Sequence, residues 1–296
     1  MKISRREAFQ LGAVTTLTVL AAKGLPKSTL APKELKIGFV TDVHYADANP
    51  SGTRFYKESL RKLNEAASAW KKGGVDIIVE NGDLIDSATK NTSRDLEMGF
   101  LKEIDKVLKS VKKPVHYVFG NHCLVSMSKA DFLKTVGQKD PHHSTDKNGW
   151  HLVFLDACYR ADEVPYENGN FKWSDTEIPK AQREWLKADL AKTKLPTLVF
   201  VHQRMDQEAG NLQRVKSAEA VQEILTASGK VKAVIMGHSH TNEIKRIGGV
   251  DYITLGAMVE GSGAENNAYS ILHLSGEGEI KLEAFRHHLE HPLVKK

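Results

Sequence analysis

The chain has 296 residues, of which 41% are hydrophobic and 27% charged, a composition typical of a soluble globular enzyme. Its net charge of +5 comes from residues 1–36, where seven basic residues accompany two acidic ones. Residues 37–296 hold 35 basic and 35 acidic residues. A neutral body lacks the basic stripe that nucleic-acid binding usually needs, so we expect no nucleic-acid partner. Two cysteines, Cys123 and Cys158, are too few for a disulfide scaffold, and buried free thiols are favoured over a single bridge.

The N-terminus has the pattern of an export signal. Arg5 and Arg6 stand shortly before residues 10–22, a short run of mostly small and apolar residues, and this resembles the bacterial twin-arginine (Tat) signal. The run is too short and too rich in Thr, Gly and Ala for a membrane span. An uncleaved anchor helix, or a helix of the fold, is the alternative. We predict an export signal and linker over residues 1–33, one domain over 34–296, and an exported, periplasmic or secreted bacterial protein without stable membrane insertion.

Short apolar runs that end in polar clusters predict strands along the rest of the chain. In order, these are residues 35–41, 76–79, 115–119, 151–155, 197–201, 233–236, 252–255, 269–274 and 280–285. Several are solidly apolar, as expected for strands covered on both faces. Apolar residues at helical spacing predict helices over 54–72, 96–108, 178–191 and 217–227. Glycines at 73–74 and 229 end two of these helices as C-caps.

The order of these elements indicates an α/β fold. Strand–helix alternation through about residue 236 indicates a largely parallel sheet, whereas the last fifty residues switch to consecutive strands. A sheet-on-sheet packing with helices outside accounts for both halves. Residues 157–174 form a long, aromatic-rich segment without periodicity. It is either a functional loop or a surface excursion packed by its own aromatics, and both interpretations stay open.

Polar motifs follow five of the predicted strands. They are Asp42-Val43-His44, Gly82-Asp83-Leu84-Ile85-Asp86, Gly120-Asn121-His122, His202 and Gly237-His238-Ser239-His240. Ligands in an open α/β sheet collect outside the carboxyl ends of its strands, so these loops are expected to converge. Alternate residues of an extended segment point the same way, so the two ends of D-x-H, and of H-x-H, are expected to face one cation. The glycine before each ligand group lets the backbone turn sharply and approach closely.

The residue types in these motifs suit transition-metal ions. Imidazole and carboxylate together bind Mn, Fe, Zn, Ni or Co, whereas an all-oxygen set favours Mg or Ca. Each motif alone has an ordinary explanation, because G-N-H suits a turn and the Asp of G-D-x-x-D suits a helix N-cap. Two histidines after a buried strand, as in G-H-x-H, are more costly to leave without partners. All five motifs at successive strand ends therefore predict a metal site.

Together the five motifs resemble the calcineurin-like metallophosphoesterase superfamily, over about residues 35–285. The resemblance implies a four-layer α/β/β/α sandwich with two divalent metal ions (Mn, Fe or Zn). Carried over by position, it assigns one metal to Asp42, His44 and His240, the other to Asn121, His202 and His238, and a bridging role to Asp83. It also implies that a hydroxide bridging the metals attacks a phosphate. His122 would act as general acid or charge stabiliser, oriented by Asp86.

A closer similarity exists within the superfamily. Residues 42–47, 52–56, 155–157 and 255–260 are similar to the Mn-dependent ADP-ribose/CDP-alcohol diphosphatase group. This similarity implies hydrolysis of a phosphoanhydride or phosphodiester in a small, nucleotide-like substrate. Arg54 is a candidate phosphate contact because guanidinium matches phosphate geometry, and a solvated residue at the start of a helix is the alternative. The competing interpretations are a broad-specificity periplasmic phosphomonoesterase or phosphodiesterase, and a catalytically inactive binding module on the same fold.

The chain departs from the superfamily pattern near the ligands. Cys123 follows G-N-H where the family usually has Asp or Glu, and Asn81 replaces a common glycine. Neither position is expected to ligate a metal, but Cys123 bears on the positioning of His122. Ser87 follows Asp86 in place of the Arg-Gly of Ser/Thr protein phosphatases, which argues against that branch.

Overall fold

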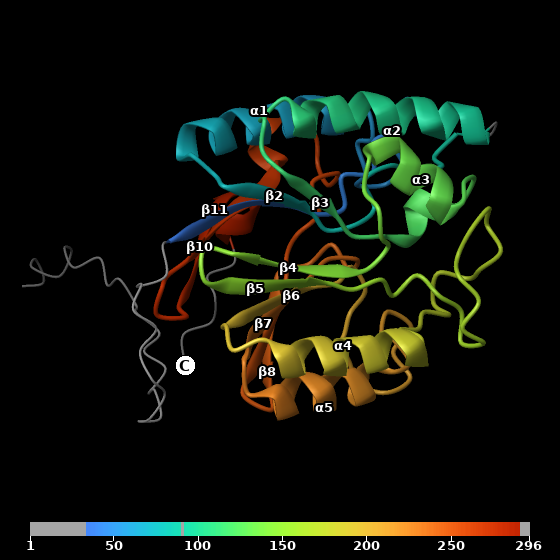
Figure 1. Ribbon diagram of the computed structural model, residues 1–296. Coiled ribbons are helices and arrows are strands. Elements are labelled where there is room, and N and C mark those ends of the chain that lie inside the picture. Colours follow the sequence, from blue (N-terminus) through green and yellow to red (C-terminus); the bar gives the residue numbers. More distant parts are fainter. Residues whose placement is uncertain (1–33, 90–91, 291–296) are drawn as a thin grey trace, which may run out of the picture.

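The computed structural model describes residues 34–89 and 92–290. Within these residues the chain forms two β-sheets that lie face to face, with helices on the outer side of each (Figure 1). This is the four-layer α/β/β/α arrangement that the family resemblance implied. The predicted export signal and linker, residues 1–33, lie outside the described residues. No helix of the described part combines the length and apolarity that a membrane crossing requires.

The first sheet has the strand order β11-β10-β1-β2-β3. Its strands are β1 (Leu35–Val40), β2 (Ile77–Glu80), β3 (Val115–Tyr117), β10 (Ala268–Leu274) and β11 (Ile280–Arg286). The first three are parallel, and β10 and β11 extend the sheet in antiparallel fashion. Its outer face carries α1 (Glu58–Gly73), α2 (Arg94–Lys109) and α3 (Lys129–Val136).

The second sheet has the order β4-β5-β6-β7-β9-β8. Its strands are β4 (His143–Lys147), β5 (Trp150–Phe154), β6 (Thr197–Phe200), β7 (Val231–Met236), β8 (Glu243–Ile247) and β9 (Val250–Thr254). The inner four strands are parallel, and β4 and β8 are antiparallel edges. The helices α4 (Lys180–Lys192) and α5 (Ala218–Ser228) cover its outer face. The strands that alternate with helices are thus divided between two mixed sheets, in the sheet-on-sheet packing with outer helices that the sequence predicted.

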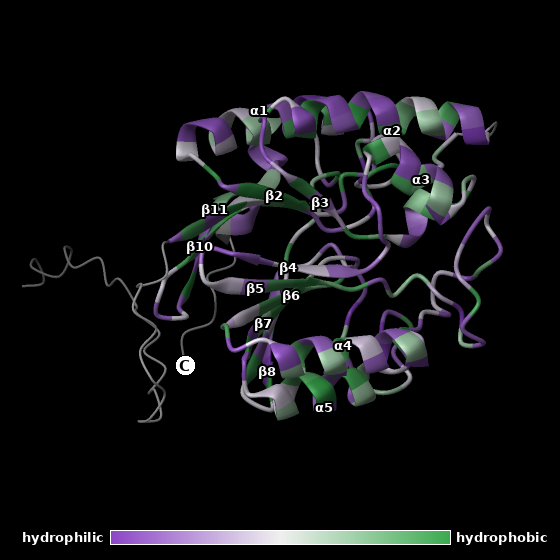
Figure 2. Ribbon diagram, viewed as in Figure 1, coloured by the Kyte–Doolittle hydropathy of each residue, from purple (hydrophilic) through white to green (hydrophobic). Residues whose placement is uncertain are grey.

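Buried apolar side chains line both faces of each sheet, which explains the solidly apolar strands. On β2, Ile77 and Val79 point to the other sheet, whereas Ile78 packs under the helices. Between the sheets Phe39 stacks on Phe200, and Phe200 stacks on Phe154. Figure 2 shows hydrophobic residues concentrated in the central strands, while the helices alternate between hydrophilic and hydrophobic residues. Because both faces are buried, the strand ends are fixed rigidly in space.

The four helices found from helical spacing are all present, and so are the two glycine C-caps. Gly74 and Gly229 end α1 and α5 in the left-handed conformation, with φ of 67° and 65°. The sequence interpretation missed α3, β4 and β8. Cys123 and Cys158 are both buried free thiols, as favoured from the sequence.

The aromatic segment 157–174 fits both interpretations left open for it. Tyr166 is buried and stacks on Phe171 with 4.0 Å between ring centroids, so the segment is packed by its own aromatics. Trp173, in contrast, is 46% exposed and its ring centroid lies 5.8 Å from that of His238. One indole of this segment therefore stands beside the predicted ligands.

Candidate metal centre

All nine predicted ligand and acid–base residues lie in loops that follow strands. The loops after β1, β2 and β3 carry Asp42, His44, Asp83, Asp86, Asn121 and His122, and the loops after β6 and β7 carry His202, His238 and His240. The five loops converge as expected, at the edges of the two sheets, where the family resemblance places the metal site. Each sheet therefore contributes part of the site.

One group of three side chains consists of Asp42, His44 and His240. The Nε2 atoms of His44 and His240 lie 3.6 Å and 3.4 Å from Asp42 Oδ1, and 3.2 Å from each other. Asp42 and His44 are fully buried. This grouping brings together the three residues that the family resemblance assigned to one metal.

A second group consists of Asp83, His202 and His238. His202 Nε2 lies 3.1 Å from Asp83 Oδ2, and the rings of His202 and His238 meet edge to face. The same Asp83 oxygen lies 3.6 Å from His44 Nε2, in the first group. Asp83 thus stands between the two groups, where a bridging ligand would stand. Asn121 begins the short 3₁₀ turn whose next residue donates its backbone N–H to Asp83 Oδ1 over 2.7 Å.

The backbone at these residues is unusual. Asp42, His44, Asp83, His238 and His240 all have positive φ, from 47° to 71°. Non-glycine residues in this left-handed region are uncommon, although Asp and His are enriched there, and they gather at functional sites. The expected extended backbone was therefore wrong for both triplets, although Asp42 and His44 do lie in one group, as expected for D-x-H. Because of the turn, His238 and His240 enter different groups and do not face one cation.

The glycines that precede the ligands allow close approach between loops. A Cβ on Gly237 would lie 2.1 Å from Thr41 Oγ1 and 2.5 Å from Asp42 Oδ2. A Cβ on Gly120 would lie 2.2 Å from both the backbone nitrogen and Oδ1 of Asp83. No other residue type fits at either position without moving a ligand loop.

Outer hydrogen bonds fix the histidine rings. Asp86 Oδ2 lies 2.8 Å from His44 Nδ1 and 3.2 Å from His122 Nδ1, so this carboxylate serves two rings, not His122 alone. Glu260 Oε1 lies 2.5 Å from His240 Nδ1. Such contacts hold the outer nitrogen of a ring and direct the other nitrogen inward. Sequence reasoning placed Glu260 within a segment resembling the family but gave it no role.

The backbone also holds a ring in this way. His202 Nδ1 lies 2.8 Å from the carbonyl oxygen of Asn81, the residue that departs from the family glycine. A carbonyl oxygen accepts only, so Nδ1 carries the hydrogen and Nε2 faces the carboxylates. Asn81 therefore supports the centre through its main chain, and the side-chain substitution does not disturb this contact.

The charges in the centre are strongly coupled. Burial alone lowers the pKa of His202, but the carboxylates of Asp83 and Asp42 outweigh it and raise that pKa to about 9. For His240, burial is likewise outweighed, by hydrogen bonds with Asp42 and Glu260, and its pKa also rises to about 9. Burial raises the pKa of Asp42 and Asp83, but the neighbouring histidines lower both well below the usual range. Positive charge is therefore strongly favoured between these carboxylates.

The donor set fits divalent cations. Asn121 Oδ1 and His238 Nε2 are buried and have no hydrogen-bond partner among the described residues, although unpaired buried polar atoms are costly. Burial lowers the pKa of His238 to about 3, so its imidazole is neutral and able to ligate. Imidazole, carboxylate and amide oxygen in one buried site match the transition-metal preference expected from the sequence.

His122 and Arg54 border the two groups. His122 Nδ1 contacts Asp86, and its ring lies edge-on to that of His44 at 4.6 Å. His122 also forms a third possible ligand group with His44 and Asp83. Arg54 precedes α1, and its guanidinium lies 3.5 Å from Asp86 Oδ2 with about one third of the side chain exposed. The Arg54 side chain is therefore only partly exposed, and its contact with a substrate phosphate stays a prediction.

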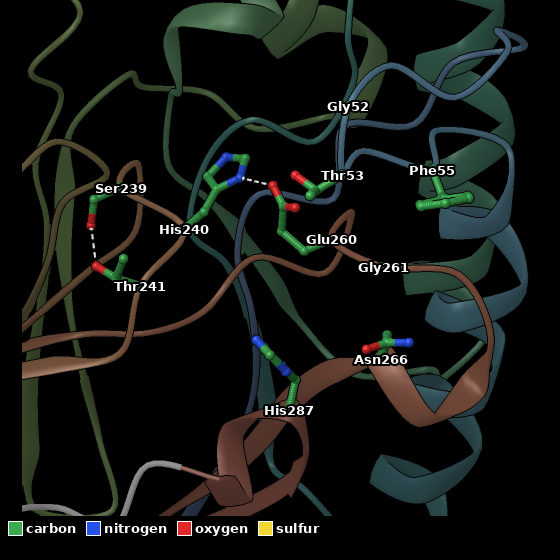
Figure 3. A pocket seen from close by; sticks show the side chains of 10 residues that line it. All are labelled: Gly52, Thr53, Phe55, Ser239, His240, Thr241, Glu260, Gly261, Asn266 and His287. Atoms are coloured by element: carbon green, nitrogen blue, oxygen red, sulfur yellow. Dashed lines mark hydrogen bonds and ion pairs between the residues drawn. The ribbon is translucent and has the colours of Figure 1, made fainter.

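A cavity of about 560 Å³ opens beside His240. In Figure 3, Glu260 and Thr53 lie next to the His240 ring, with Phe55 and Asn266 further along the wall. Its lining mixes hydroxyl, amide and aromatic groups. The cavity provides room for an organic group next to His240, a member of the first ligand group.

Residues 35–242 match the family described as calcineurin-like phosphoesterase. This match covers more than half of the chain, and the chain belongs to that family. Among solved structures, a dimetal phosphatase from Danio rerio has a TM-score of 0.72 over 85% of this chain and 98% of that chain, at 21% identity. At this identity the likeness shows the fold alone.

Two curated relatives bear on activity. A manganese-dependent ADP-ribose/CDP-alcohol diphosphatase of Danio rerio is 30% identical over 140 residues, which are 45% of this chain and 42% of that protein. The chain thus matches less than half the length of that relative. A probable cyclic nucleotide phosphodiesterase of Fibrobacter succinogenes is 26% identical over 227 residues, 73% of this chain and 76% of that protein.

Proposed function

We propose that the protein is a hydrolase that uses two divalent metal ions to cleave a phosphoanhydride or phosphodiester bond in a small, nucleotide-like substrate. The observation that carries the proposal is the arrangement of two ligand groups around Asp83, with His44 Nε2 3.6 Å and His202 Nε2 3.1 Å from the same oxygen. A carboxylate in that position can contact two cations at once. Every ligand type that the family pattern requires is present, which argues against a catalytically inactive binding module.

Bound cations would stabilise negative charge on phosphoryl oxygens and activate water as the nucleophile. The chain itself supplies the acid. Burial lowers the pKa of His122, but the charge of Asp83 and the hydrogen bond with Asp86 outweigh it and raise that pKa. The raised pKa favours the protonated imidazole, which could donate to the leaving oxygen or offset phosphoryl charge. Arg54 contacts the same Asp86 carboxylate as His122 and adds a second positive charge that suits a phosphate oxygen.

The substrate class rests on the relatives and the cavity. The Danio rerio relative is named for ADP-ribose and CDP-alcohols and for manganese, and the Fibrobacter succinogenes relative for cyclic nucleotides. All of these substrates join a phosphate to a nucleoside. The cavity beside His240, with Phe55 and Asn266 in its wall, has room for such an organic group. We therefore favour Mn²⁺ as the cation and a nucleotide derivative as the substrate.

A substrate panel tests this proposal. The protein is reconstituted with Mn²⁺ and assayed with ADP-ribose, p-nitrophenyl phosphate and bis-p-nitrophenyl phosphate, with Asp83→Asn as the matched inactive control. We expect the highest kcat/KM for ADP-ribose and loss of all turnover in the control. Strong turnover of the monoester alone would reject the diphosphatase assignment.

A phosphodiesterase is the second candidate, because the Fibrobacter succinogenes relative matches 73% of this chain, a longer stretch than the diphosphatase match. Adding a cyclic nucleotide to the same panel separates the two. A kcat/KM for the cyclic nucleotide or for bis-p-nitrophenyl phosphate above that for ADP-ribose would favour this candidate. A monoester and diester turned over equally well would indicate broad specificity.

We also propose export by the twin-arginine route, which rests on the pattern of residues 1–22 alone. A reporter that is active only outside the cytoplasm, fused after residue 33, should be exported in a bacterium. Replacing Arg5 and Arg6 with lysine should retain the reporter inside the cell. Export that survives this replacement would contradict the proposed route.

A further inference from the structure

Lys62 is a buried lysine whose ammonium group binds backbone carbonyls. Its side chain, on α1, is 1% exposed, and Nζ donates to the carbonyl oxygens of Met258, Glu260 and Gly261 over 2.7–2.8 Å. A longer contact of 3.4 Å reaches the carbonyl of Asn266. One ammonium thus organises the main chain of residues 258–266, which follows β9.

This segment lies directly against the metal centre. Val259 donates its backbone N–H to the carbonyl of Asp42 over 3.1 Å, and its own carbonyl accepts from Phe55 over 2.9 Å. The neighbouring Glu260 holds His240 Nδ1 over 2.5 Å. The position of the Glu260 carboxylate, and hence of the His240 ring, therefore depends on the path of this segment (Figure 3).

The carbonyl oxygens need the ammonium in order to stay together. Carbonyl oxygens that point at one spot repel one another unless a cation or donor fills it, and an unfilled buried site would leave them unpaired. A buried ammonium is costly, and burial lowers the pKa of Lys62 to about 8. Such a group is retained where it fixes one conformation among several.

We propose that Lys62 is a positioning residue for the cation held by Asp42, His44 and His240. It acts through the main chain of residues 258–261 on Glu260, and through Glu260 on His240. The cation assigned to Asn121, His202 and His238 does not depend on it. This inference deepens the proposed function, because it assumes that the centre binds cations.

Calorimetric titration with Mn²⁺ alone tests the inference. Lys62→Met removes the donors and keeps an apolar side chain of similar length. We expect it to weaken one of the two Mn²⁺ sites about 10- to 100-fold, the usual effect of losing an outer partner of a ligand, and to leave the other unchanged. Lys230→Met is the control, because Lys230 also donates to a backbone carbonyl, that of Leu190. Lys230 precedes β7, whereas the loop that carries His238 and His240 follows β7. The control should retain both affinities.

A second variant shows whether the effect passes through Glu260. Glu260→Gln should weaken the same Mn²⁺ site as Lys62→Met, and the double variant should lose no more than the larger single loss. Losses that multiply would overturn the proposed path. Glu260→Gln also keeps the test decisive if Lys62→Met fails to fold, because unchanged affinity at both sites in Glu260→Gln would overturn the inference by itself.

The outcomes separate this inference from the proposed function. A wild-type chain that binds two Mn²⁺ ions but hydrolyses none of the phosphate compounds would reject the proposed function. The positioning role of Lys62 would still be decided by the Mn²⁺ affinities of the variants. A Lys62→Met variant with two wild-type Mn²⁺ affinities would reject the positioning role, whatever the activity. A wild-type chain that binds no Mn²⁺ overturns both.

Discussion

Replacing Gly120 with alanine tests the packing of the centre most directly. The new Cβ would lie 2.2 Å from the backbone nitrogen and Oδ1 of Asp83, whereas ordinary contacts fall between 3.4 and 4 Å. The two loops would therefore have to separate by about 1 Å. The φ of Gly120 is −104°, which alanine adopts easily, so the penalty is steric only. Overpacking of this kind costs about 1–3 kcal/mol, and here it displaces the carboxylate shared by both ligand groups.

The assay is denaturant unfolding of the cation-free chain, together with Mn²⁺ content after dialysis. Gly120→Ala should lower the free energy of unfolding by about 1–3 kcal/mol and reduce Mn²⁺ content at both sites. Gly99→Ala is the matched control, because Gly99 lies within α2 and a Cβ there meets open space. It should raise the free energy of unfolding by about 0.5–1 kcal/mol and keep both ions. A Gly120→Ala variant with wild-type stability and full Mn²⁺ content would refute the reasoning.

Three further predictions concern the ligands and the proposed acid. His122→Ala should retain both metal ions and lose about 10²- to 10⁴-fold in kcat; a loss of metal in elemental analysis would reassign His122 as a ligand. Asp83→Asn should reduce metal occupancy at both sites, and unchanged metal content would refute the bridging role. In the cation-free chain the pKa of His202 and of His240 is about 9, above the usual 6.5, so each stabilises the fold below pH 6.5 and this contribution fades as the pH rises through 9. Because a ligand imidazole must be neutral, Mn²⁺ affinity should rise between pH 6.5 and 9, with proton release seen in calorimetry; an affinity that stays constant over this range would contradict the linkage.

The fold was readable from the sequence where strands are buried on both faces. The missed strands β4 and β8 are sheet edges with polar sequences, His143–Lys147 and Glu243–Ile247, that carry no apolar pattern. A turn signal was available for each, because Asn148-Gly149 and Gly248-Gly249 join them to β5 and β9 with positive φ at both residues. Helix α3 also had a local signal, the capping box between Ser128 and Asp131, but at 8 residues it is too short to show a clear helical periodicity.

The site was readable because its ligands come in short motifs beside strand ends. The carboxylates that hydrogen-bond to the ligand histidines could not be predicted in the same way, because these hydrogen bonds join segments that are distant in the sequence. Glu260 meets His240 only through the path of the chain after β9, and the Asp86 carboxylate is shared with His44 across a separation of 42 residues. The left-handed backbone of His238 and His240 was also not predicted, because Asp and His adopt that conformation without a sequence marker.

The two-sheet origin of the ligands has a consequence for assembly of the chain. Asp42, His44, Asp83 and Asn121 follow strands of the first sheet, and His202, His238 and His240 follow strands of the second. Each cation therefore joins both sheets, and at an ion concentration 100-fold above Kd each site adds about 2.7 kcal/mol against their separation. If the chain were cleaved between β3 and β4, the fragments would each keep an incomplete ligand set. Divalent ions should then promote complementation of the fragments, and chelators should reverse it.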